Sequence, residues 1–194
     1  LRLSTSQYGV TGIGESQVNP VACIDSTSGD ISCYWVTQNS SQSQFSLKGQ
    51  RFSGTSRAWG HSGITFLPLG STTLQPAGCH PRADGGTTAI WNSGSIPQPV
   101  MITAASFDDL GHPIWKGDAS GVNGGIAIST SDSNKSRTAT ATSPSGEIVI
   151  AWSDDRMVFG GSGNPRIYGQ NLLPDGMLGG AALASASGCS YEQR

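Results

Sequence analysis

The chain has 194 residues, and its 13 acidic and 11 basic side chains give a net charge of −2. That length fits one domain with an ample core. The charges are interspersed and no apolar run reaches the length of a membrane span, so the composition indicates neither a nucleic-acid surface nor a transmembrane helix. Frequent glycine, low charge and the lack of amphipathic helical stretches predict an all-β fold with many turns.

In chain order, residues 1–6 are expected to form a strand, and residues 7–19 a long glycine-containing loop. A first unit then runs to about Gly63. Ile64 is expected to open a second unit, which contains a stretch interrupted by glycine and proline at 68–81. The divisions predicted are 1–63, 64–125 and 126–180 for three units, and 181–194 for the start of a fourth.

The three units share a strand that follows a glycine turn and ends on tryptophan. In each unit the glycine precedes the tryptophan by six residues, and mostly β-branched, small or aromatic residues lie between them. Such a segment is typical of a strand buried on both faces. The pairs are Gly29 with Trp35, Gly85 with Trp91, and Gly146 with Trp152.

A second aromatic position recurs at a fixed distance. Trp59 lies 24 residues after Trp35, and Trp115 lies 24 after Trp91, whereas in the third unit Gly179, 27 residues after Trp152, stands in place of the aromatic. Each period therefore holds about four short strands. Repeats of four strands indicate the blades of a β-propeller. The alternative is an ordinary β-sandwich in which three strands look alike by coincidence.

Three blades and a partial fourth do not close a propeller ring, which normally needs four to eight blades. The sequence therefore predicts that other chains or fragments complete the propeller, either in a homo-oligomer or in a complex with other pieces of one precursor.

Four cysteines in a weakly charged, Ser- and Gly-rich chain favour an oxidising compartment. Cys23 and Cys33 flank one turn and are expected to form a disulfide across a hairpin. Cys79 and Cys189 remain and are able to pair with each other. The alternative is four free thiols in a cytosolic protein. No paired Cys or His spacing indicates zinc.

The segment from Val149 to Gly176 resembles a repeat of secreted or surface-exposed bacterial proteins, with the pattern V-A-W-x-D-x-R followed by I-Y-x-Q-x-L-x-x-x-G. The third unit matches closely. The first unit keeps Trp35 and Gln50, and the second has Ser106 where glutamine would fall. The resemblance implies a β-propeller fold and a secreted or cell-surface location, while leaving function open.

Asp154, Asp155 and Arg156 follow the third repeated tryptophan. They are candidates for a calcium site, a sugar site or a catalytic carboxylate pair. The alternative, favoured by their place in a repeated motif, is a turn in which aspartate accepts backbone N–H groups and pairs with arginine. No cofactor other than calcium is indicated.

Trp59 and Trp115 are candidates for stacking on a sugar ring, and the alternative is that each plugs the gap between neighbouring blades. His61, His80 and His112 are isolated in the sequence and favour no metal or catalytic site.

Two functions are compatible with these features. The first is a non-catalytic extracellular β-propeller module for binding or adhesion, to a glycan or a protein, or a structural part of a surface assembly. The second is a fragment of a glycoside-active propeller enzyme, with Asp108, Asp154 or Asp155 as its carboxylates. The lack of a recognisable catalytic motif favours the first.

Overall fold

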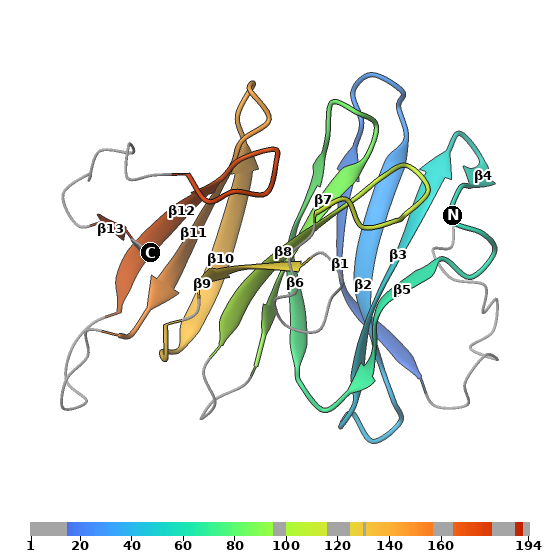
Figure 1. Ribbon diagram of the computed structural model, residues 1–194. Helices are drawn as coiled ribbons and strands as arrows, with labels where there is room; N and C mark the ends of the chain where they lie inside the picture. The colour runs from blue at the N-terminus through green and yellow to red at the C-terminus, as the bar shows by residue number, and fades with distance from the viewer. Residues whose placement is uncertain are drawn as a thin grey trace.

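The structure is a computed structural model that describes residues 15–94, 100–115, 125–129, 131–156, 165–179 and 189–191. These residues form thirteen β-strands in three separate sheets and contain no helix. The all-β prediction is confirmed. Within the described ranges, no helix is long and apolar enough to cross a membrane. Figure 1 shows the three sheets following one another across the molecule in chain order.

The first sheet has the order β1-β2-β3, with both β4 and β5 paired to β3. All of its neighbouring strands run antiparallel. Its strands are β1 (Ser16–Ile24), β2 (Ile31–Gln38), β3 (Phe45–Ser53), β4 (Ser56–Arg57) and β5 (Ile64–Gly70).

The second and third sheets each contain four consecutive strands, in the orders β6-β7-β8-β9 and β10-β11-β12-β13. Only the last pair, β12 with β13, is parallel. The strands of the second sheet are β6 (Leu74–Pro81), β7 (Thr87–Ser93), β8 (Met101–Phe107) and β9 (Gly125–Ser129). Those of the third are β10 (Lys135–Thr142), β11 (Ile148–Asp154), β12 (Arg166–Leu172) and β13 (Cys189–Tyr191).

The repeated tryptophans occupy matching places. Trp35, Trp91 and Trp152 lie on β2, β7 and β11, the second strand of each sheet, and each is at most 3% exposed. The first strand of every sheet carries a β-bulge at or beside the tryptophan of its neighbour. In β1 and β10 the bulge holds a non-glycine residue with φ of 53°, Asn19 and Arg137 respectively.

The last strand of each sheet was expected, from the sequence, to be the first strand of the following unit. Ile64 and Ile126 were expected to open new units, but β5 pairs with β3 and β9 pairs with β8 of the preceding sheets. Likewise, residues 189–191 join the third sheet beside β12. The strands that open the sheets, β1, β6 and β10, were not recognised, because Pro20, Pro76 and the bulges break the alternation that marks a strand.

Two hydrophobic clusters lie between the sheets. The first joins β2 and β3 to β6, β7 and β8 around Tyr34, Trp91 and Phe107. The second joins the opposite face of the second sheet to β11 and β12 around Ile90, Trp152 and Leu172. The middle sheet is therefore buried on both faces, and each of these two tryptophans packs toward the preceding sheet.

The disulfide links two sheets, and the predicted Cys23–Cys33 pair is wrong. Cys23 of β1 is bonded to Cys79 of β6, while Cys33 is free and buried. Cys23 lies opposite Ser32 in the register, so Cys33, the next residue, points to the other face of the sheet. Because Cys79 is already bonded, the suggested pairing of Cys79 with Cys189 is wrong as well. The side chain of Cys189 lies outside the described part of the chain.

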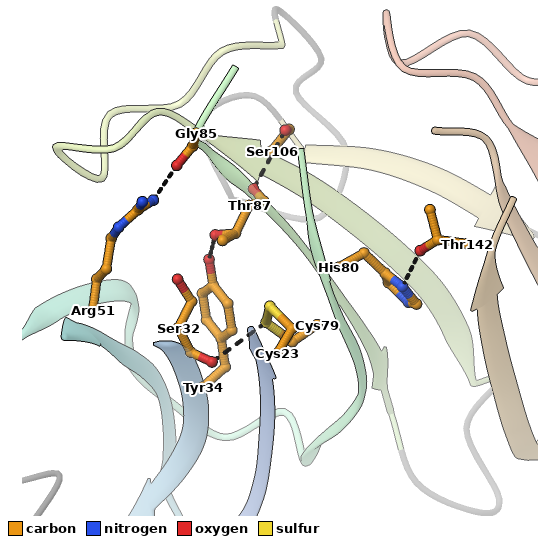
Figure 2. Close-up of a disulfide and its surroundings, with 10 residues drawn as sticks. All are labelled: Cys23, Ser32, Tyr34, Arg51, Cys79, His80, Gly85, Thr87, Ser106 and Thr142. Atoms are coloured by element: carbon orange, nitrogen blue, oxygen red, sulfur yellow. Dashed lines mark hydrogen bonds between the residues drawn. A yellow bond between two sulfur atoms is a disulfide. The ribbon is translucent and has the colours of Figure 1, made fainter. Parts of the chain in front are cut away.

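Polar contacts cross the same boundary as the disulfide (Figure 2). The hydroxyl groups of Tyr34 and Thr87 are hydrogen-bonded, and the Arg51 guanidinium donates to the carbonyl oxygen of Gly85. On the other side of β6, the His80 ring lies 2.6 Å from the hydroxyl oxygen of Thr142 in the third sheet. The three sheets are thus joined by covalent, polar and apolar contacts.

Candidate functional site

Asp154 is at the centre of a buried polar cluster at the end of β11. Its carboxylate is 1% exposed and accepts the indole N–H of Trp152 at 3.0 Å and the backbone N–H of Arg156 at 2.9 Å. The Arg156 guanidinium forms an ion pair with the same carboxylate and lies 4.1 Å above the Tyr168 ring. The arrangement fits the turn-and-pairing interpretation of this motif.

The charge of Asp154 is stabilised by these partners. Burial alone would raise the pKa of the carboxyl group, but the hydrogen bonds from Arg156 and Trp152 outweigh it and lower the pKa to about 2. A general acid in glycoside hydrolysis needs a raised pKa instead. Asp154 therefore lacks the electrostatic environment of that acid.

Asp155 faces a different partner from its neighbour. Its carboxylate accepts the backbone N–H of Asn134 at 2.8 Å and the side-chain amide of the same residue at 2.9 Å. Asp155 thus secures the loop before β10. Asp108, the third candidate carboxylate, accepts the backbone N–H groups of Leu110 and His112 in the turn after β8. Each of the three carboxylates is engaged by its own local turn or loop.

Trp59 and Trp115 are buried between sheets, with 4% and 6% of their surfaces exposed. The Trp59 indole N–H donates to the carbonyl oxygen of Asp109, in the turn that follows β8 of the second sheet. The Trp115 indole N–H donates to the carbonyl oxygen of Pro174, in the turn that follows β12 of the third sheet. This geometry fits the interpretation of both residues as plugs between units.

The histidines lie apart from one another. His80 is buried between β6 and β10, His61 is exposed beside Arg57, and His112 is exposed beside Asp108. In the described ranges, no group of three or more His, Cys, Asp or Glu side chains is placed to hold a metal ion. The calcium suggestion for Asp154 and Asp155 stays untested.

A polar cavity of about 270 Å³ lies where the ends of several strands meet, and no motif in the sequence pointed to it. Four amide side chains, from four different strands, line it together with a half-buried phenylalanine and a buried lysine. They are Asn19 of β1, Gln38 of β2, Phe45 of β3, Gln75 of β6, Asn92 of β7 and Lys135 of β10.

A repeat signal for this cavity does exist in the sequence. Asn19 and Gln75 precede the repeated tryptophan of their sheet by 16 residues, and Lys135 precedes Trp152 by 17. All three belong to the first strand of their sheet, at or just before its bulge. Bulges commonly lie next to functional sites, where they redirect side chains. Alignment of the three units on tryptophan would have revealed these polar positions.

Comparison with known proteins adds no assignment. The sequence matches no protein-family model, and a search of curated proteins finds no significant match.

Proposed function

We propose that the chain is a non-catalytic, extracellular β-propeller module that binds a glycan or a protein as part of a surface assembly. The observation that carries the proposal is the docking that repeats from sheet to sheet. Trp59 of the first sheet bonds to the turn after β8, and Trp115 of the second bonds to the matching turn after β12. Contacts that recur with a constant direction are typical of stacked repeat units.

The approach of the first strands supports a radial arrangement. The disulfide joins β1 to β6, and the contact of His80 with Thr142 joins β6 to β10. Strands that open successive blades lie side by side around the axis of a propeller. The interstrand disulfide also supports an oxidising, extracellular environment, because disulfides persist poorly in a reducing cytosol.

The third sheet has an outer face, opposite Trp152, on which apolar side chains are exposed. Val149 and Ile167 on that face are 37% and 46% exposed, whereas Ile90 and Ile102, on the corresponding face of the second sheet, are almost fully buried by the third. A further sheet of the same kind, from another chain or another part of a longer one, would bury this face. The proposal therefore includes partners that complete the ring.

The test is a glycan array probed with the whole chain, combined with a panel of chromogenic glycosides. Binding without turnover is the expected result. Hydrolysis that is abolished by Asp154→Asn would contradict the proposal and favour a glycoside-active enzyme. A chain that retains no glycan on the array and captures no surface protein would also contradict it.

A further inference from the structure

We propose that the polar cavity between the strand ends is a binding site for a single neutral sugar residue. This proposal rests on the binding function proposed above and assigns it a place in the molecule. The volume of about 270 Å³ lies close to the lower end of the range for small-molecule sites, about 300–1,000 Å³. A ligand of roughly one sugar ring suits that space.

The side chains around the cavity match the chemistry of hydroxyl groups. An amide offers a carbonyl acceptor and two N–H donors, so it is able to accept from one hydroxyl group and donate to the next. Four amides from separate strands surround the cavity: Asn19, Gln38, Gln75 and Asn92. A ligand with several neighbouring hydroxyl groups would engage more of these donors and acceptors than a ligand with one polar end.

Asn92 is the most buried of these four amides. It is only 7% exposed, and its side-chain oxygen accepts the hydroxyl group of Thr138 at 2.9 Å. That bond orients the amide, and among the described residues its N–H groups are available to a further acceptor. Gln75 lies directly opposite Asn92 in the β6–β7 register, so both side chains project from the same face of the sheet.

Phe45 supplies the apolar part of the wall. Its half-buried side chain lines the cavity beside the amides. A sugar ring presents C–H groups on one face and hydroxyl groups at its edge, and an aromatic surface beside polar groups complements both. The combination of amides and one aromatic therefore favours a saccharide over a purely polar ion.

The charges around the cavity favour a neutral ligand that is bound and not cleaved. Lys135 borders the cavity, but its ammonium group donates to the carbonyl oxygens of Ser131 at 2.7 Å and Ser133 at 3.3 Å. Its donors are thus directed into the loop before β10. No Asp or Glu is among the described residues that line the cavity. The carboxylate pair that most glycoside hydrolases use is therefore missing from its described wall.

The experiment is an NMR titration of the ¹⁵N-labelled whole chain. The probes are the methyl glycosides of glucose, galactose and mannose, with N-acetylglucosamine, and glucuronic acid serves as the anionic counterpart. The side-chain amide signals of Gln75 and Asn92 report directly on the cavity. At least one neutral probe is expected to shift them, with affinity measured from the same titration.

Two variants test the assignment without disturbing the fold. Gln75→Ala removes an exposed amide, and Asn19→Gly removes another while keeping the positive φ of 53° accessible. Each should weaken binding roughly 3- to 10-fold, the effect of losing about one hydrogen bond. Gln17→Ala, an exposed position on the same strand that does not line the cavity, should leave affinity unchanged.

The outcomes separate this site from the general function. If the array shows glycan binding while both variants bind as the parent does, the cavity assignment is overturned and the binding function stands. Shifts produced by glucuronic acid alone would overturn the neutral ligand class. If no sugar shifts the amide signals but the chain captures a protein, the cavity proposal fails alone. If neither glycan nor protein is bound, both proposals fail.

Discussion

The indole N–H of Trp59 donates to the carbonyl oxygen of Asp109 at 2.8 Å, from the loop after β4 to the turn after β8. The same relationship recurs one sheet later between Trp115 and Pro174, at 3.3 Å. In both cases the receiving turn contains a glycine with positive φ next to the tryptophan ring, Gly111 at 85° and Gly176 at 90°. Backbone conformation and close approach therefore both select glycine at these turns.

The first prediction concerns Gly176→Ala. A Cβ atom at this position would lie 2.7 Å from Cδ1 of Ile126 and 2.9 Å from two ring atoms of Trp115, so both side chains must move. We expect a loss of about 1–2 kcal/mol from the positive φ and a further 1–3 kcal/mol from overpacking. Gly29→Ala is the matched control, because φ is 77° there and nothing lies within 4 Å of the added carbon. Urea unfolding of the two variants should show the larger loss for Gly176→Ala, and equal losses would contradict the docking role.

The second prediction compares the repeated tryptophans. Truncation of Trp91 or Trp152 to alanine should cost about 3–5 kcal/mol. Substitution by phenylalanine should destabilise the two positions to different extents. The Trp152 indole N–H donates to the buried carboxylate of Asp154, whereas the Trp91 indole N–H has no hydrogen-bond partner among the described residues. Trp152→Phe should therefore cost about 1–3 kcal/mol more than Trp91→Phe. The measurement is chemical denaturation, and an equal cost for both phenylalanine variants would count against the role of Asp154.

The third prediction concerns the covalent link between the first two sheets. Non-reducing peptide mapping should recover Cys23 joined to Cys79. The bond spans 56 residues in sequence, so removing it with Cys23→Ala and Cys79→Ala should cost about 4 kcal/mol on the chain-entropy account. Cys33→Ala, which leaves the bond intact, should cost much less. A peptide that joins Cys23 to Cys33 would refute the assignment.

The fourth prediction is a pH dependence arising from His80. Burial between β6 and β10 disfavours the charged ring and lowers its pKa from 6.5 to about 4. Between pH 6.5 and pH 4 the His80 ring is therefore mostly protonated in the unfolded chain and mostly neutral in the folded chain. The free energy of unfolding is thus highest above pH 6.5 and falls as the pH drops toward 4. Unfolding free energies between pH 7 and pH 5 should show this fall.

His80→Asn should reduce the change in unfolding free energy between pH 7 and pH 5. His61→Asn, at an exposed position, is the control and should leave that change as it is in the parent chain. Titration of the His80 ring by NMR gives an independent measurement. A midpoint near 6.5 would show that the ring is accessible to protons in the folded state.

The strands that carry the repeated tryptophan could be predicted, because each follows a glycine turn and begins with an unbroken run of mostly β-branched, small or aromatic residues. The first strands could not. Pro76 and the bulge residues of β6 break the pattern, and much of β10 is polar and exposed. Since these strands were missed, the second and third predicted units each began one strand too early, and β5 and β9 were attached to the wrong units.

Side-chain direction explains the other failures. Sequence proximity brought Cys23 and Cys33 to one hairpin but did not show that the register places them on opposite faces. The polar cavity was missed for a related reason, since Gln75 and Asn92 come together only through pairing of β6 with β7. By contrast, the sequence already favoured the turn-and-pairing interpretation of Asp154, because a repeated motif favours a packing role for its residues. The contacts of its carboxylate with Arg156 agree with that interpretation.

The fifth prediction concerns the outer face of the third sheet. Val149 on β11 and Ile167 on β12 lie on the face opposite Trp152, where no described element covers them. The equivalent face of the second sheet is sealed by the third, so a similar sheet is the expected occupant. Light scattering should therefore give a native mass above the 20.0 kDa of one chain.

A charge placed on that face should prevent the association, because a lysine ammonium group would be stripped of water against an apolar partner. Ile167→Lys should lower the native mass toward 20.0 kDa. Leu110→Lys is the matched control, since Leu110 is 61% exposed in the turn after β8, away from the open face. If the parent chain is a well-folded monomer whose mass neither variant changes, the third sheet needs no neighbour and the proposed ring is wrong.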